Sequence, residues 1–236
     1  MTNAQPSSPI EIELHPDTGR CRATYRQLIV RAVTEVVERF ERGNVHVDSR
    51  AIEKAVFLAN PEEARALISG VFGIPSEQIP ATFCGTPDGT TLYMVTEDIV
   101  EPILRELYPS IPWRGGVEYF ECVKHEITHL AHEKWAIEQK GTSDAMGPTW
   151  FFESLAILVA GQFPTLAEEV PLEPSALRKI LERSEHEKVS YTDFARVGYS
   201  LARSFDLRRM IEAAADQTLP DLLAHYTAIS EKEDHR

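Results

Sequence analysis

The longest segment of this chain that can form a single uninterrupted helix covers residues 117–140, which contain neither glycine nor proline. Glycine costs roughly 1 kcal/mol and proline roughly 3 kcal/mol in a helix interior, so their absence over this length favours one long helix. His125 and His129 stand four residues apart in it and project from the same face. Their Cβ atoms are then about 6 Å apart, and both imidazoles can reach one zinc ion at about 2.0–2.1 Å.

Glu126 completes the pattern H-E-x-x-H, with a carboxylate at the flank of the histidine face. There it can accept a proton from a water molecule that the metal activates, which is the role of a general base. Such a string arises by chance in roughly a few per cent of chains rich in His and Glu, and the alternative is an exposed helix whose histidines pair with glutamates. A third ligand is needed, because catalytic zinc normally has three protein ligands and one open position.

His132 is the nearer candidate for that ligand, since it lies seven residues after His125 and close to the same face. Seven residues of straight helix rise about 10.5 Å, which is too far for both imidazoles to share one tetrahedral ion. Proteases with H-E-x-x-H-x-x-G-x-x-H solve this with a glycine, but here His132 occupies the glycine position and Trp135 that of the last histidine. We expect His132 to be a partly exposed residue of the helix or a group that supports the ligands.

Glu153 is the more distant candidate, in the apolar segment 148–161 that follows a loop flanked by glycine and proline. A carboxylate among Trp150, Phe151 and Leu155 is costly to bury unless a cation compensates it. The alternative is a glutamate on the exposed first turn of a helix, where the helix dipole favours it. Together with the histidine pair, Glu153 completes a His–His–Glu set through a helix–loop–helix return.

The combination of H-E-x-x-H with the later pattern W-x-x-E-S-x-A resembles the gluzincin metallopeptidases, the superfamily that contains thermolysin and the aminopeptidases. The match covers roughly residues 117–161. By position, the resemblance implies zinc bound by His125, His129 and Glu153, with Glu126 as the base. A common form of the second motif has glycine after the ligand glutamate, where this chain has Ser154, and that position bears on how closely the two helices can pack.

The resemblance also implies a small N-terminal lobe with an edge strand that pairs with extended substrate. Residues 91–95 would be that strand, so Thr91, Leu92 and Tyr93 are expected to bind substrate. Related enzymes stabilise the tetrahedral oxyanion with a Tyr or His downstream of the ligand glutamate. Tyr199 is the first choice for this role, and the other candidates are Tyr191, His225 and Tyr226.

Hydrophobic periodicity predicts an α+β fold, with strands and helices mixed in the first half and helices afterwards. The expected strands are 10–14, a strand-like stretch over 45–58 that is strongest at 55–58, and 81–84 and 91–95, which are joined as a hairpin through 85–90. The expected early helices are 22–42 and 61–70. We expect one domain over residues 10–230, with an α/β lobe to about residue 115 and a helical zinc-site lobe from about residue 116. Residues 1–9 would be a flexible lead-in and residues 231–236 a solvated tail.

The formal net charge of −13 at pH 7 argues against a nucleic-acid partner, because phosphate binding needs a basic stripe. No stretch approaches the roughly 18 apolar residues of a membrane span, and the N-terminus lacks a signal-peptide pattern, so neither membrane nor export is expected. The odd number of cysteines, Cys21, Cys84 and Cys122, argues against a disulfide framework. We expect a cytoplasmic setting, with Cys122 as a small apolar core residue.

The sequence thus predicts a zinc-dependent hydrolase that cleaves peptide or small amide bonds. No G-x-M-x-N element of the related aminopeptidases is found, which favours an endopeptidase. One alternative keeps the zinc site but acts as a tailoring enzyme on a small amide or modified metabolite, because a fold and a ligand set do not fix the substrate. Another is an inactive domain of the same fold that binds proteins, although such a domain has no need of Glu126 as a base.

Overall fold

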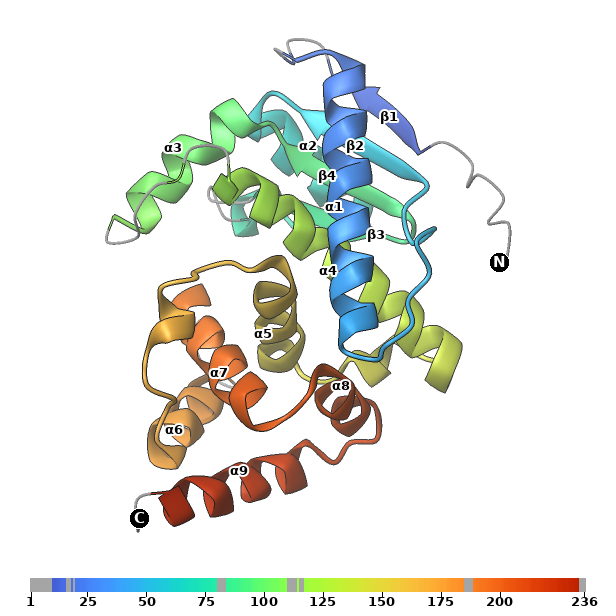
Figure 1. Ribbon diagram of the computed structural model, residues 1–236. Helices are drawn as coiled ribbons and strands as arrows, with labels where there is room; N and C mark the ends of the chain where they lie inside the picture. Colours follow the sequence, from blue (N-terminus) through green and yellow to red (C-terminus); the bar gives the residue numbers. More distant parts are fainter. Residues whose placement is uncertain are drawn as a thin grey trace. The chain divides into compact units, whose positions relative to one another are not determined.

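A computed structural model of the chain describes residues 10–15, 18, 20–79, 84–109, 114, 117–184 and 189–233. The chain divides into two compact units, of which the first comprises residues 1–35 and 49–130 and the second residues 36–48 and 131–236. The described residues have the predicted α+β fold, with a mixed sheet and helices first and a mainly helical part afterwards (Figure 1). The predicted single domain over residues 10–230 stays a prediction, and the predicted lead-in, residues 1–9, lies outside the described residues.

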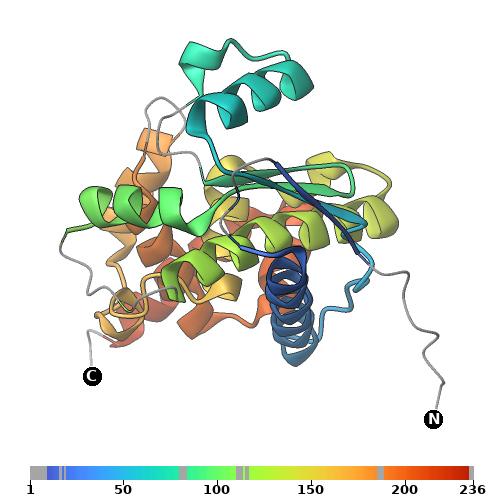
Figure 2. The ribbon, with the colours of Figure 1, turned by 90° about the horizontal axis from the view of Figure 1, so that it is seen from above.

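The first unit is built on a four-stranded sheet in the order β1-β2-β4-β3. The strands are β1 (Glu11–Leu14), β2 (Lys54–Leu58), β3 (Gly85–Asp88) and β4 (Thr91–Val95). β2 pairs in parallel with both β1 and β4, whereas β3 pairs antiparallel with β4 through a tight turn. β2 is buried from Ala55 to Leu58, as expected of a strand covered on both faces. α1 lies on one face of the sheet and α2 on the other (Figure 2).

α1 (Arg22–Arg42) follows the predicted helix residue for residue. Its buried side chains recur at three- and four-residue spacing: Tyr25, Ile29, Ala32, Val36 and Phe40. The Tyr25 ring stacks on Phe57 of β2 with the ring centroids 3.9 Å apart, which fixes the helix on the sheet. Just beyond the helix, Gly43 has room for no side chain, because a Cβ there would lie 2.6 Å from Leu207.

α2 (Pro61–Phe72) runs two residues beyond the predicted end at Gly70. Asn60 caps its start by accepting hydrogen bonds from the backbone amides of Glu62 and Glu63, and Pro61 occupies the first helical position. The helix stops at Gly73, whose φ of 66° is in the left-handed region that glycine adopts without strain. α3 (Glu97–Leu107) follows the sheet.

α4 (Val117–Lys140) is the predicted long helix, and it is continuous over 24 residues. Its first half belongs to the first unit and its second half to the second unit. In the first unit it is attached to the sheet through Tyr119, whose buried hydroxyl donates to the Val95 carbonyl oxygen at 3.0 Å.

The second unit contains the remaining helices: α5 (Thr149–Ala160), α6 (Pro174–Ser184), α7 (Tyr191–Ser204), α8 (Leu207–Ala215) and α9 (Leu219–Glu233). α5 is buried along most of its length and packs closely on α7. The contact is made where Gly198 of α7 meets Ser154 of α5, since a Cβ at Gly198 would lie 2.8 Å from the Ser154 carbonyl oxygen. The small residue that this helix contact needs is supplied by α7, opposite the serine.

One prediction about local structure is wrong. The first strand of the hairpin is Gly85–Asp88, not residues 81–84, because the Gly89–Thr90 turn sets Asp88 opposite Thr91 and pairing continues back from there. Residues 81–83 lie outside the described part of the chain. α9 continues to Glu233, and the predicted solvated tail at 231–236 stays a prediction.

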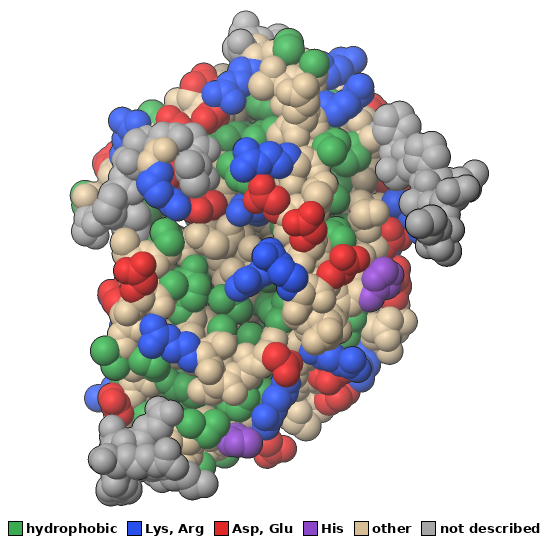
Figure 3. All heavy atoms as spheres, viewed as in Figure 1, with side chains coloured by type: hydrophobic (Ala, Val, Ile, Leu, Met, Phe, Trp, Pro, Cys, Tyr) green, Lys and Arg blue, Asp and Glu red, His purple; other side chains and the backbone are tan. Residues whose placement is uncertain are grey.

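In the described part of the chain, no helix is both long and apolar enough to cross a membrane. On the face drawn in Figure 3, acidic and basic side chains are interspersed. The described residues on that face form no continuous basic stripe of the kind that a nucleic-acid backbone requires.

Candidate metal centre

His125 and His129 face each other on α4, as their spacing predicted. Their Nε2 atoms are 3.0 Å apart, and the two rings are nearly perpendicular, at 84° with the centroids separated by 4.7 Å. His125 is buried, with 4% of its surface exposed, and His129 is half-buried. The helix therefore presents two imidazole nitrogens at one point, sheltered from bulk water.

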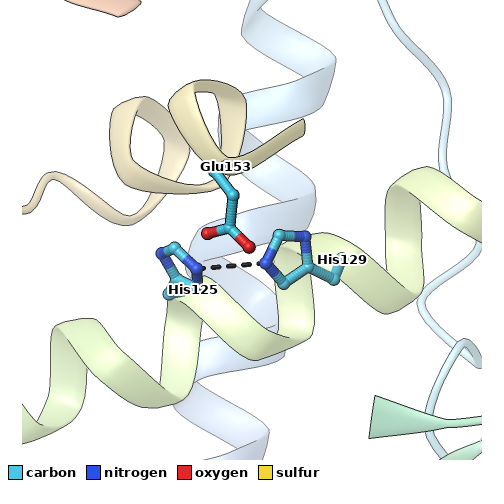
Figure 4. A group of neighbouring side chains, drawn as sticks. All are labelled: His125, His129 and Glu153. Carbon is cyan, nitrogen blue, oxygen red and sulfur yellow. Dashed lines mark hydrogen bonds between the residues drawn. The ribbon is translucent and has the colours of Figure 1, made fainter. Parts of the chain in front are cut away.

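Glu153 extends from α5 toward this pair (Figure 4). The Nε2 atoms and a Glu153 carboxylate oxygen all lie within 4.8 Å of one another, and Glu153 is half-buried. α5 is held against the second half of α4 by an edge-to-face contact between His132 and Phe151, with centroids 6.1 Å apart. The three side chains form a group that could hold a metal ion, and the ligand role of Glu153 stays a prediction.

The three side chains fit one metal ion. A tetrahedral ion with bonds of about 2.0–2.1 Å separates its ligand atoms by about 3.3 Å. The histidine nitrogens, at 3.0 Å, are already close to that spacing. One Glu153 carboxylate oxygen lies within 4.8 Å of the histidine ligand atoms. Two imidazoles and one carboxylate leave a fourth position open, which is the donor set typical of catalytic metal sites.

Glu126 is half-buried on the same helix, one residue after His125. The charge of its carboxylate influences the pKa of the Cys122 thiol, which lies four residues earlier and so one helical turn away. The hydrogen bond between the Cys122 and Cys84 thiols and burial together raise the pKa of the Cys122 thiol well above its ordinary value, and the negative charge of Glu126 adds to this rise. By its position directly after His125 on α4, Glu126 is expected at the flank of the histidine face, and its role as the base stays a prediction.

His132 differs from the prediction that it is partly exposed. It is buried, with 1% of its surface exposed, and its ring packs between Phe151 of α5 and Trp135 of α4. Its role in the described structure is to bring α4 and α5 together rather than to bind the ion, in agreement with the argument from helix rise.

Tyr199 does not join the cluster in this structure. Its hydroxyl donates to the carbonyl oxygen of Gln162 at 2.6 Å. Gln162 follows the C-terminal end of α5, whereas Glu153 lies in the second turn of that helix. Tyr226 and His225 are likewise engaged elsewhere, with the Leu172 carbonyl and with Arg209. The oxyanion role of Tyr199 stays a prediction.

Thr91, Leu92 and Tyr93 are not on an edge strand, contrary to the prediction. They belong to β4, which is hydrogen-bonded on both sides, to β2 and to β3. Its backbone groups are used within the sheet, so they cannot pair with an extended substrate. Among the described strands the edges are β1 and β3, and in β3 Pro87 can be tolerated because its missing N–H costs no ladder bond there. Proline beside the Asp88–Gly89 turn was the sequence signal for this edge.

Comparison of the chain with protein-family models, curated proteins and solved structures gave no match. Its fold and its site accordingly define an α+β protein with a possible metal site formed by two histidines and one glutamate.

Proposed function

We propose that this protein is a zinc-dependent hydrolase that cleaves peptide or related amide bonds. The observation that carries the proposal is the convergence of His125, His129 and Glu153 within 4.8 Å, with a further carboxylate, Glu126, at the flank of the same helix. A cluster that only held a structural ion would have no use for that second carboxylate or for an open ligand position.

In the proposed reaction the metal and the side chains around it have separate roles. Zinc bound there supplies Lewis acidity, which polarises the substrate carbonyl and lowers the pKa of a water molecule. Glu126 accepts the proton from the attacking water and returns it to the leaving nitrogen, as a general base and then a general acid. The burial of His125 keeps bulk water from competing for the site.

The sheet edge suggests how a peptide is held. Apart from the missing N–H of Pro87, the edge of β3 offers backbone groups to an extended chain, in the manner of strand addition. Cys84, directly before β3, contacts Cys122 of α4, one turn ahead of the metal ligand His125. A peptide on this edge would lie alongside the metal helix, and the absence of a G-x-M-x-N element favours an endopeptidase.

Metal analysis of the purified protein tests the site. We expect about one zinc per chain in the wild type and none in His125→Ala or Glu153→Ala. Glu138→Ala is the matched control, because it removes an exposed carboxylate from the same helix. Wild-type protein that takes up no metal from a zinc-containing buffer would contradict the proposal.

The role of Glu126 needs a separate measurement. Glu126→Gln keeps the shape of the side chain but cannot accept a proton, so we expect unchanged zinc content and loss of hydrolysis of a fluorogenic peptide library. Unchanged turnover in this variant would refute Glu126 as the base. Hydrolysis of small amides with no cleavage of peptides would assign the site to the tailoring enzymes instead.

A further inference from the structure

Two cysteine thiols meet next to the metal helix. Cys122 is buried on α4, with 7% of its surface exposed, and Cys84 is half-buried directly before β3. The thiols are hydrogen-bonded to each other. The third cysteine, Cys21, is exposed. A contact between two thiols serves none of the steps of hydrolysis.

The backbone places these thiols together independently of their side-chain contact. Val95, the last residue of β4, donates its amide to the Cys84 carbonyl at 2.8 Å and accepts at its own carbonyl from the Tyr119 hydroxyl at 3.0 Å. Cys122 follows Tyr119 by three residues and so lies on the same face of α4. The start of β3 and this face of α4 are thus both attached to one residue of the sheet.

Tyr108 borders the same pair. Its side chain is half-buried, and desolvation raises its pKa to about 12, with a smaller contribution from Cys84 and Cys122. The phenol therefore stays neutral at ordinary pH. Cys84 is the more exposed of the two and therefore the one that a reagent in solution reaches first.

We propose that Cys84 and Cys122 are a modification site, a dithiol that a small-molecule disulfide oxidises to an internal disulfide joining β3 to α4. The proposal goes beyond the hydrolase function and does not depend on it. Its position gives it a consequence for the metal site, because Cys122 precedes His125 by three residues and Glu126 by four.

The chemistry balances as two thiol–disulfide exchanges. The Cys84 thiolate attacks one sulfur of the small disulfide, forming a mixed disulfide and releasing one small thiolate. Cys122 then attacks the Cys84 sulfur, forming the internal disulfide and releasing the second small thiolate. The two protons lost by the cysteines are taken up by the two released thiolates. The protein dithiol is oxidised by two electrons, and the small disulfide is reduced to two thiols.

The disulfide would close a loop from residue 84 to residue 122, which includes α3 and the first turn of α4. Cross-linking a loop of this length restricts the unfolded chain and stabilises the folded one. We expect the oxidised protein to melt several degrees above the reduced protein, and reduction with dithiothreitol to reverse the shift.

The experiment uses the Cys21→Ser variant, so that only the two thiols in question remain. After incubation with oxidised glutathione, we expect titratable thiols under denaturing conditions to fall from two to none. Mass spectrometry without reduction should find a peptide linked through Cys84 and Cys122, and no retained glutathione. Cys21→Ser with Cys84→Ser is the matched control, and its melting temperature should not rise on oxidation.

Three outcomes would overturn the proposal: both thiols remaining free, glutathione retained on either cysteine in place of the internal link, or a link between two chains. The measurement is made on chelator-treated and zinc-loaded protein alike. Because neither thiol counting nor peptide mapping requires the metal, failure of the zinc hypothesis would leave this result unaffected.

Discussion

Gly198 offers a direct test of how α5, and with it Glu153, is positioned. A methyl group at this position would lie 2.8 Å from the Ser154 carbonyl oxygen, 3.3 Å from its Cβ and 3.4 Å from its carbonyl carbon. Two of these atoms belong to the backbone of a buried helix, so they cannot move without displacing α5 itself. Gly198→Ala should therefore push the two helices apart.

Two opposing terms set the size of the effect. Alanine in place of glycine in a helix interior gains about 1 kcal/mol from propensity, whereas overpacking a buried contact costs about 1–3 kcal/mol. Because the clash involves backbone atoms, we expect a cost at the upper end of this range, about 2–3 kcal/mol, which exceeds the propensity gain by about 1–2 kcal/mol. At about 2–4 °C for each kcal/mol in a chain of this size, Tm should fall by about 2–8 °C.

The assay is thermal and urea unfolding of the metal-free protein, followed by zinc titration of the folded variant. Gly70→Ala is the control, because it too lies inside a helix, α2, but a Cβ there meets nothing within 4 Å. It should raise Tm by the propensity gain alone. A Gly198→Ala protein as stable as the wild type would refute the reasoning. Weakened zinc binding, by contrast, would connect the helix contact to Glu153.

Three further predictions concern the fold and the ion. Zinc at 100 times its Kd should stabilise the wild type by about 2.7 kcal/mol and leave the melting of His125→Ala unchanged, as calorimetry can measure. Asn60→Ala removes the cap of α2 and should cost about 1 kcal/mol in urea unfolding, whereas a cost near zero would show that the cap is dispensable. Burial raises the pKa of Tyr25 to about 12, so the folded state retains a proton that the unfolded state loses near pH 10. The free energy of unfolding should therefore fall by up to about 3 kcal/mol as pH rises from about 10 to about 12. Tyr25→Phe should flatten this pH dependence in urea unfolding. Tyr191→Phe, which changes an exposed tyrosine, should leave it as in the wild type.

The helices could be predicted because their signals are local. The 117–140 segment has no helix breaker, and the structure forms α4 over the same residues. The sheet could not be predicted in the same way, because alternation marks a strand but not its neighbours. β3 is a further case, since Gly85–Asp88 includes glycine, proline and aspartate, which are all rare in strands. These residues form a strand because the turn at Gly89 sets them against β4.

The same distinction applies to the site. Helical periodicity was enough to place His125 and His129 together, and the apolar surroundings of Glu153 indicated that it needed a cation. Other contacts join residues far apart in sequence, and no periodicity reports them. The pairing of Cys84 with Cys122 and the bond from Tyr199 to Gln162 are of this kind.

Because α4 is continuous, the residues of the candidate metal site are not all held in place in the same way. Both imidazoles and the Glu126 carboxylate are spaced by the helix alone, so they stay in register as long as that one helix is intact. Glu153 is the sole member of the group that arrives by tertiary packing. Any local opening of α5 would leave an ion held by two nitrogens, too weakly to remain at low free metal. Retention of the ion would then report on the docking of a single helix, and metal release would begin well before the chain unfolds.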